Sequence, residues 1–264
     1  MVRNAACHRA ARATAVSITV SVVSHGHGQK VLCLLDDLAA MGADDICEIL
    51  LTLNIPEPAL SSDVRSRKWP FQIHLIEDGR AKGFGSNHNA AFRRCGFPHF
   101  CVLNPDVSLT ENPFPALISG LAQPHAGCTF PLQVDKDGHV QKSAREVPTL
   151  LALFRRYFGL RRKSLGDEPV HWVTGACLLF DSAAYRKLGG FDERYFMYCE
   201  DVDLCLRLQL AGYALVATGA RVIHVAYRAS HRDAQHLLWH LRSLLRLWCS
   251  DSYRTFVKQR SAVC

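Results

Sequence analysis

Short runs of β-branched residues alternate with amphipathic stretches through the first half of the chain. The apolar, β-branched runs predict four strands, at 16–24, 46–53, 71–76 and 100–103. Between them, helices are predicted at 29–40 and 85–95. Strands joined by helices in this order form a parallel sheet with helices on its faces, and ligands bind at the carboxyl ends of its strands. We therefore expect an α/β fold with a Rossmann-like, mostly parallel central sheet flanked by helices.

The second half of the chain is less regular. The run 128–134, an Asp137-Gly138 turn and the residues from Val140 onward predict a hairpin. The later elements are expected to be a strand at 170–180, a helix at 182–188, an acidic helix at 200–211, short edge strands at 214–217 and 221–225, and a helix at 236–248. The sequence contains no internal repeat and no low-complexity linker. We therefore expect a basic extension at 1–15, one domain at 16–230 and a helical extension at 231–264.

The formal net charge of +7 raises the question of nucleic-acid binding. The basic residues gather at 155–163 and 221–246, and the first group is interleaved with large apolar side chains. This pattern suits an anionic membrane surface better than a duplex groove, although a solvated helix face would explain it equally well. We therefore expect no nucleic-acid partner, and the pattern suggests a peripheral contact with an anionic membrane surface.

The longest apolar stretches fall far short of the ~20 residues that a membrane-spanning helix needs. No segment of signal-peptide type precedes the first predicted strand. The 11 cysteines include no C-x-x-C pair, which favours reduced thiols over a disulfide or zinc framework. Together these features predict a cytoplasmic protein, and any membrane contact would then lie on the inner face of the cytoplasmic membrane.

The tripeptide Asn104-Pro105-Asp106 directly follows an apolar run that predicts a strand. A carboxylate at the end of a strand, beside a proline that fixes the turn, is well placed to bind a divalent cation that also contacts phosphate oxygens. The same tripeptide is also ordinary turn chemistry. On this motif alone, a cation site and a simple turn remain alternatives.

Five carboxylates fall within the twelve residues from Asp192 to Asp203. On a helix that begins near Glu200, Asp203 can pair with Arg207 four residues later, which makes Asp203 structural. Glu200 and Asp201 remain at the start of the helix as candidates for a general base. The helix dipole lowers the pKa of a carboxyl group there, whereas crowding by other carboxylates raises it. The sequence leaves the balance of these two effects open.

Two further segments contain residues that could bind a ligand. Residues 82–90 open a predicted helix with glycines and place Asn87 and Asn89 on its first turn, where backbone amides can bind a phosphate or sugar oxygen. Glycines at such turns also occur for purely steric reasons. His224 ends an apolar run, where its imidazole could join Asp106 on a cation or could simply be a hydrogen-bonded core residue.

Taken in order, these segments resemble glycosyltransferase family 2, and especially its bacterial rhamnosyltransferase-like members. The resemblance covers roughly residues 16–230 and rests on the order and spacing of several motifs. These motifs are 20–24 (VSVVS), 83–89 (GFGSNHN), 103–107 (LNPDV), 172–176 (WVTGA), 189–193 (GGFDE) and 196–206 with its Glu-Asp-Val-Asp core.

The resemblance implies a GT-A fold with a donor half at about 16–110 and a smaller acceptor half at about 111–230. It implies a nucleotide-diphosphate sugar as donor, a glycan or glycolipid acceptor and inversion at the anomeric carbon. Asp201, with Glu200 beside it, would be the catalytic base, and Asp106 with His224 would hold a divalent cation, Mg²⁺ or Mn²⁺. The donor would contact Ser24, Asn54, Gly83, Asn87, Asn89, Asn104 and Asp106. The acceptor would contact Trp172, Gly175 and Ala176.

The chain departs from the pattern of the family at three places. Asn104 stands where an aspartate is usual, 24–26 (SHG) replaces an aromatic-Asn pair, and 52–57 lacks the aspartate that commonly reads the nucleobase. The function implied by the resemblance is transfer of a sugar, with dTDP-rhamnose as a candidate donor, to a lipid-linked or polysaccharide acceptor in cell-surface glycan synthesis.

Three other functions are alternatives to sugar transfer. A nucleotidyltransferase would favour a basic, glycine-rich phosphate loop after the first strand, and 26–28 (GHG) is a poor candidate for it. An NAD-dependent oxidoreductase would need a G-x-G-x-x-G motif there, which is absent. A non-catalytic subunit that binds a membrane or a partner protein is the remaining alternative, and the presence of Asp106 and Asp201 argues against it.

Overall fold

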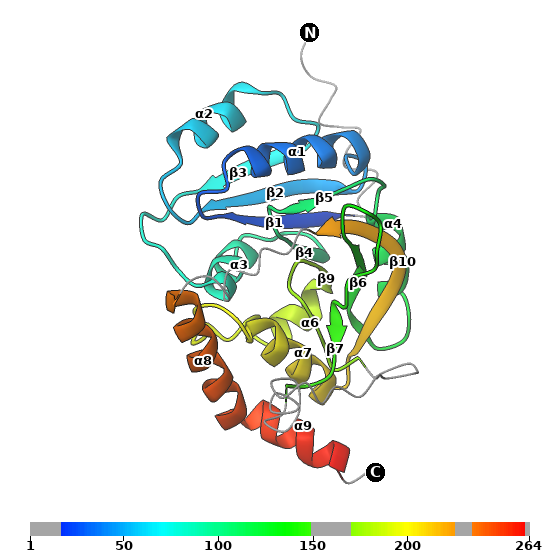
Figure 1. The fold of residues 1–264 in the computed structure, drawn as a ribbon. Coiled ribbons are helices and arrows are strands. Elements are labelled where there is room, and N and C mark those ends of the chain that lie inside the picture. The colour runs from blue at the N-terminus through cyan, green and yellow to red at the C-terminus, as the bar shows by residue number, and fades with distance from the viewer. Residues whose placement is uncertain (1–16, 149–169, 225–233, 262–264) are drawn as a thin grey trace.

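The computed structural model describes residues 17–148, 170–224 and 234–261 (Figure 1). Within these ranges an 8-stranded sheet has the order β3-β2-β1-β4-β9-β6-β10-β5. Its strands are β1 (Ile18–Ser24), β2 (Ile46–Leu53), β3 (Gln72–Ile76), β4 (His99–Leu103), β5 (Val107–Ser108), β6 (Ala126–Val134), β9 (Cys177–Asp181) and β10 (Ala214–His224). β9 and β5 run antiparallel to their neighbours and the other pairings are parallel. The predicted mostly parallel sheet is confirmed.

Helices cover both faces of this sheet, and the alternation of side chains along β4 shows how. The helices are α1 (Gln29–Met41), α2 (Pro58–Ser66), α3 (Phe84–Phe92), α4 (Phe114–Leu121), α6 (Ser182–Lys187), α7 (Glu200–Leu210), α8 (Ala234–Cys249) and α9 (Asp251–Ser261). Cys101 and Leu103 pack in the core with buried residues of α1 and α4, whereas Phe100 and Val102 pack with residues of α6 and α7 on the opposite face. A separate two-stranded sheet joins β7 (Ala144–Arg145) to β8 (Trp172–Val173).

The structure corrects two strand predictions. The strand expected at 170–180 is two strands, β8 and β9, in different sheets, because the chain turns at 174–176. The two short edge strands expected after 213 form one strand, β10, which lies inside the sheet between β6 and β5. A register irregularity between Ala217 and Arg221 interrupts the pattern of β10, which explains why its sequence reads as two pieces.

The predicted hairpin after β6 is reduced to an isolated antiparallel bridge between Val134 and Val140. The helices α2, α4 and α9 were not predicted. The basic apolar segment at 155–163 and the extension at 1–15 lie outside the described residues. Among the residues that are described, no helix has both the length and the hydropathy needed to span a bilayer.

The C-terminal helices are anchored to the rest of the molecule through Asp203 on α7. Arg207 Nε donates to one carboxylate oxygen of Asp203 at 2.7 Å, which confirms the pair expected from their spacing. Ser252 Oγ on α9 donates to the other oxygen, also at 2.7 Å. Asp203 is thus fully engaged in joining α7 to α9, as a structural residue should be.

Candidate functional site

Several candidate residues lie at one edge of the sheet because the strand register brings them there. Leu103 is paired with Val22 of β1 and with Cys177 of β9, so the turn after β4 lies beside the end of β1 and the start of β9. His224 at the end of β10 is paired with Val107, the residue after Asp106. Asp106 and His224, which are far apart in the sequence, therefore meet at the carboxyl ends of the parallel strands.

Asp106 and His224 form a pair that suits a cation. Nε2 of His224 lies 3.5 Å from Oδ1 of Asp106, and this buried oxygen has no hydrogen-bond partner. On the other side of the ring, Nδ1 of His224 is 3.1 Å from Oε1 of Gln133. Since an amide oxygen can only accept, Nδ1 of His224 donates to it, and Nε2 is the ring atom that faces the carboxylate. An imidazole nitrogen and a carboxylate oxygen facing each other are the kinds of atom that would hold a divalent cation such as Mg²⁺ or Mn²⁺.

The electrostatics of this strand end favour an ionised carboxylate. Burial acts to raise the pKa of Asp106, but the contact with His224, a backbone hydrogen bond and the charge of His27 together outweigh it, and the pKa lies below its usual value. Burial lowers the pKa of the nearby His27, although the charge of Asp106 opposes that shift. Asp106 therefore carries a negative charge at neutral pH, as a cation ligand requires.

The turn at 174–176 connects this strand end to the acidic helix. The backbone N–H of Gly175 donates to Oδ2 of Asp201 at 3.2 Å. One residue later, the carbonyl of Ala176 accepts a hydrogen bond of 2.8 Å from the N–H of Asn104. The turn thus brings the carboxylate of Asp201 and the Asn104–Asp106 loop into one site.

The start of α7 holds one buried carboxyl group, Glu200, and one partly buried carboxyl group, Asp201, next to unusual backbone. Tyr198 and Cys199 both have a left-handed conformation, with φ of 71° and 64°, directly before Glu200. Non-glycine residues rarely adopt it, and two in succession are typical of functional sites. Burial, together with the charge of Asp201, raises the pKa of Glu200 to about 8. Burial also raises the pKa of Asp201, despite the N–H groups of Val202 and Gly175 that donate to it.

The predicted donor residues near β1 and β2 are held by internal hydrogen bonds. The side-chain amide of Asn54 bonds to the backbone of Lys82 through both its atoms, at 2.7 and 2.9 Å. Ser24 is fully buried and its Oγ accepts from the N–H of His27 at 3.2 Å. These contacts shape the turns at the carboxyl ends of β1 and β2, and a contact of either side chain with a donor stays a prediction.

The segment 83–89 also has a structural explanation. The amide of Asn89 accepts from the hydroxyl of Tyr185 and from the N–H of Phe191, and donates to the carbonyl of Phe191. Asn87 is buried and donates to the carbonyl of Lys82 at 3.3 Å. A Cβ on Gly83 would lie 2.6 Å from the carbonyl oxygen of Phe196, so glycine is needed for close backbone approach. This segment fastens α3 to the part of the chain that precedes the acid pair, and a donor contact here stays a prediction.

On the predicted acceptor side, Trp172 is part of β8. Its Nε1 donates to the carbonyl of Glu146 at 2.8 Å, and the guanidinium of Arg145 lies 5.5 Å from the centroid of its ring. The charge of Arg145 also acts on Asp201. Trp172 therefore packs beside Arg145, whose charge reaches Asp201. The contact of Trp172 with an acceptor stays a prediction.

Sequence reasoning missed residues that orient the site. Gln133 fixes the ring of His224, and it could have been noticed as a buried polar residue within the apolar run 128–134. The carboxylate of Glu57 accepts from the N–H groups of Gly26 and Gly28, at 3.0 and 2.9 Å, and so holds the turn after β1. No local sequence signal connects Glu57 with glycines that lie about thirty residues earlier.

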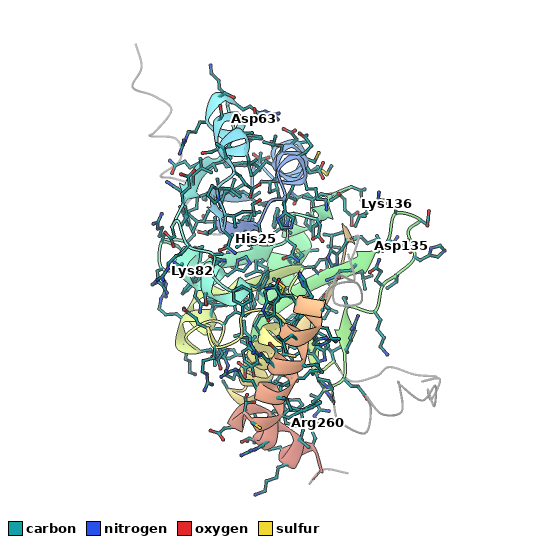
Figure 2. All side chains as sticks on the ribbon, turned by 60° about the vertical axis from the view of Figure 1, so that its left-hand side comes forward. His25, Asp63, Lys82, Asp135, Lys136 and Arg260 are labelled. Carbon is teal, nitrogen blue, oxygen red and sulfur yellow. The ribbon has the colours of Figure 1, made fainter. Side chains whose placement is uncertain are left out.

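A second acidic group lies on the turn after β6. Within the described parts of the chain, Asp135, Asp137 and His139 are the one group of three or more potential metal ligands whose ligand atoms all lie within 4.8 Å of one another. Figure 2 shows Asp135 on a turn at the side of the molecule, away from His25 after β1. Oδ1 of Asp135 already accepts from the N–H groups of Asp137 and His139, so the cluster is explained as turn structure.

A hollow of about 840 Å³ lies beside the site, at the carboxyl ends of β2 and β3. Its lining includes Asn54, Ile55, Glu57, Arg65 and Glu77. Its volume falls within the range of small-molecule sites. Glu57 of its lining holds the turn after β1, and His27 of that turn lies near Asp106. The Asp106–His224 pair and the acids at 200 and 201 thus lie on the two sides of the turn at 174–176, and the hollow lies beside the turn after β1.

Comparison with known proteins agrees with this arrangement. Residues 100–261 match the sequence profile described as glycosyl transferase family group 2. A protein of Mycobacterium tuberculosis (strain H37Rv), named N-acetylglucosaminyl-diphospho-decaprenol L-rhamnosyltransferase, is 39% identical over 199 residues, which are 65% of this chain and 65% of that protein. Rhamnosyltransferase WbbL of Escherichia coli (strain K12) is 28% identical over 87% of this chain and 91% of its own length.

Solved structures show the same fold. The mannosyltransferase PcManGT from Pyrobaculum calidifontis, in complex with GDP-Man and Mn²⁺, superposes with a TM-score of 0.61 at 19% identity, over 87% of this chain and 64% of that one. GalNAc-T7, solved with UDP, GalNAc and Mn²⁺, gives a TM-score of 0.64 at 15% identity, over 80% of this chain and 43% of that one. These likenesses confirm the expected GT-A type of α/β fold.

Proposed function

Because the chain belongs to glycosyl transferase family group 2, we propose that it transfers a sugar from a nucleoside diphosphate to a hydroxyl of an acceptor glycan, with inversion at the anomeric carbon. The observation that carries the proposal is the turn at 174–176, which hydrogen-bonds to the carboxylate of Asp201 and to the backbone of Asn104. Direct displacement needs a base for the attacking hydroxyl and positive charge near the departing diphosphate. On one side of this turn Asp201 would be the base, and on the other side the loop at 104–106 would hold the positive charge through a bound cation.

Asp201 is the base in this mechanism. The N–H groups of Gly175 and Val202 donate to its oxygens and favour its ionised form, while burial raises its pKa and makes it a better proton acceptor. Glu200, one of whose buried oxygens lacks a partner, stays protonated beside the charge of Asp201. The pair thus holds one negative charge, on Asp201, which takes the proton of the acceptor hydroxyl.

Asp106 and His224 would hold the divalent cation. When bound, the cation stabilises the negative charge that develops on the diphosphate leaving group. Gln133 keeps Nδ1 of His224 protonated, which leaves Nε2 free as a ligand. Asn104, where the family has an acid, keeps an oxygen donor but lowers the negative charge of the site by one.

The names of the relatives suggest the substrates. The Mycobacterium tuberculosis and Escherichia coli relatives are named rhamnosyltransferases, and the first name contains a sugar linked through diphosphate to decaprenol. We assign to this chain a rhamnosyl donor such as dTDP-rhamnose and a lipid-linked or polysaccharide acceptor in cell-surface glycan synthesis. The hollow at the ends of β2 and β3 would hold the nucleobase. The reaction would then take place in the cytoplasm, at the inner face of the membrane.

The proposal is tested by thermal unfolding with a panel of nucleoside diphosphates and nucleotide-sugars, with Mn²⁺, with Mg²⁺ and with chelator. A ligand that binds only the folded state stabilises it by about 2.7 kcal/mol at a hundred times its dissociation constant. We expect one nucleotide to stabilise the protein in a metal-dependent way, and Asp106→Ala to remove that dependence.

Asp137→Ala is the matched control, because Asp137 belongs to the acidic turn after β6. It should keep the metal-dependent stabilisation of the wild type. If Asp106→Ala kept the metal-dependent stabilisation and Asp137→Ala lost it, the cation would bind at the acidic turn after β6 and not at Asp106. Absence of a response to any nucleotide would contradict the transferase itself.

A further inference from the structure

The outer face of α8 exposes a continuous apolar surface. Leu237, Leu238, Leu241 and Leu245 are between 47% and 60% exposed, and their spacing places them on one side of the helix. Ser243, Leu244 and Leu247 on the other side are buried. In Figure 1, α8 lies on the outside of the molecule, remote from α1 and α2. Four half-exposed leucines in a row are uncommon on a protein that has no partner for them.

The same face carries uncompensated positive charge. α8 has no aspartate or glutamate, and it contributes Arg242 and Arg246. These two arginines share a hollow of about 640 Å³ with Leu245 and with Arg194 of the loop between α6 and α7. Arg246 also lies over the ring of Tyr195, and no ion pair of Arg242 or Arg246 is found among the described residues. Leucines bordered by arginines are the composition of a helix that lies in a membrane interface.

The inner face of α8 contacts the segment 196–198, which directly precedes the start of α7. Ser243 Oγ donates to the carbonyl of Met197 at 2.8 Å, and Nδ1 of His236 is 2.8 Å from the hydroxyl of Tyr198. The rings of Phe196 and Trp239 lie 4.8 Å apart. Three consecutive residues, 196–198, are thus held by α8, and two residues later comes Glu200. A surface that contacts the outer face of α8 is therefore separated from the proposed base only by α8 and by the segment 196–198.

We propose that the outer face of α8 docks on the surface of a bilayer that contains anionic lipids. A second copy of the chain is a poorer occupant, because a symmetric contact would set the arginines of one α8 against those of the other without an acid between them. An anionic lipid surface instead receives the leucines in its acyl region and the arginines among its headgroups. The inference rests on the proposed function, because docking on a bilayer would bring the site close to a lipid-linked acceptor.

The experiment is co-sedimentation of the full chain with vesicles of two parts phosphatidylcholine to one part phosphatidylglycerol, and with vesicles of phosphatidylcholine alone. We expect the wild type to bind the anionic vesicles and to bind the neutral ones more weakly. Leu241→Glu combined with Leu245→Glu should weaken binding by at least about tenfold for each leucine replaced. Val140→Glu is the control, because Val140 is an exposed apolar residue, 63% accessible, on the turn after β6; it should bind as the wild type does.

Each other outcome overturns the proposal. A wild type that binds neither vesicle shows that α8 has no lipid surface as partner, and a double variant that binds like the wild type shows that another part of the chain does the binding. A wild type that is dimeric by light scattering, and that the double variant makes monomeric, identifies a second copy as the occupant. Thermal stabilisation by nucleotide-sugar, measured in parallel without vesicles, should be equal in all variants, and its absence would contradict the transferase rather than the docking.

Discussion

The strand end at Asp106 and the helix start at Asp201 shift the pKa of a carboxyl group in opposite directions. Both aspartates are largely buried, and burial alone acts to raise both pKa values. At Asp106 the contact with His224, together with a backbone hydrogen bond and the charge of His27, outweighs burial and lowers the pKa. At Asp201 the neighbours are backbone N–H groups and a second acid, Glu200, and burial prevails.

Under the proposed mechanism, the difference suits two roles of the same kind of side chain. A carboxylate that must bind a cation is best kept ionised, whereas one that must accept a proton needs some basicity. The regular sheet provides the first environment, because strand register places His224 beside Asp106. The second environment follows the left-handed backbone at Tyr198 and Cys199, where Glu200 is buried and Asp201 is partly buried.

The largest effect that tests this contrast is expected from Asp201→Asn. The amide keeps the shape and part of the hydrogen bonding but cannot take a proton, so turnover should fall by about 10²–10⁴-fold. Donor binding, measured as metal-dependent thermal stabilisation, should stay at the wild-type level. Asp137→Asn, on the exposed turn after β6, is the matched control. Full turnover in Asp201→Asn would mean that another group accepts the proton.

The next effect concerns Glu200 and appears in the pH dependence of stability. Its folded-state pKa of about 8 lies above the ordinary value of 4.5. Between these values the folded state binds more protons than the unfolded state, so the wild type loses stability as pH rises through this window. Glu200→Gln cannot ionise and should therefore become more stable than the wild type above pH 8, by on the order of 2–4 kcal/mol, with little difference near pH 5.

Chemical denaturation of both proteins at a series of pH values measures this difference. Glu193→Gln, on the partly exposed surface, is the control and should follow the wild type. A constant difference between Glu200→Gln and the wild type at every pH would show that Glu200 ionises normally in the folded state. The contrast between the two halves of the site would then rest on Asp201 alone.

The sequence predicted the donor half more closely than the acceptor half, for a physical reason. β2 was predicted with the bounds that the structure has, because its mostly apolar run of eight residues has the length of a strand rather than of a helix. The run 170–180 is also largely apolar, yet it breaks at 174–176, where the N–H of Gly175 donates to the carboxylate of Asp201 instead of to a neighbouring strand. Such tertiary contacts leave no periodic signal in the sequence.

The candidate site follows the same division. The Asp203–Arg207 pair could be predicted, since both residues lie on one helix at a fixed spacing. The meeting of Asp106 with His224 was only one of two alternatives from the residues, and the resemblance to a family favoured it, because it depends on β10 lying inside the sheet beside β5, which the pattern did not reveal. The partner of His224, Gln133, is likewise fixed by strand order.

A smaller effect is expected where the two halves touch, at Gly83. A methyl group there would lie 2.6 Å from the carbonyl oxygen of Phe196, so Gly83→Ala must push apart α3 and the loop before the acid pair. We expect a loss of about 2–3 kcal/mol in the free energy of unfolding together with a lower turnover. Gly96→Ala is the control, because a Cβ at that position meets nothing within 4 Å. Wild-type stability in Gly83→Ala would show that the contact between the halves is loose.

The smallest effect is expected from Ser252→Ala, which tests whether Asp203 belongs to the framework or to the site. The variant loses the hydrogen bond of 2.7 Å to the carboxylate of Asp203, and part of that loss is offset because alanine is the better helix former. We expect about 1 kcal/mol of lost stability by denaturant titration and unchanged turnover. Ser119→Ala, at an exposed position of α4, controls for helix propensity and should be neutral or slightly stabilising. A clear loss of turnover in Ser252→Ala at full stability would place Asp203 among the acids that act on the acceptor, and the base would then be a group of three carboxyls instead of a pair.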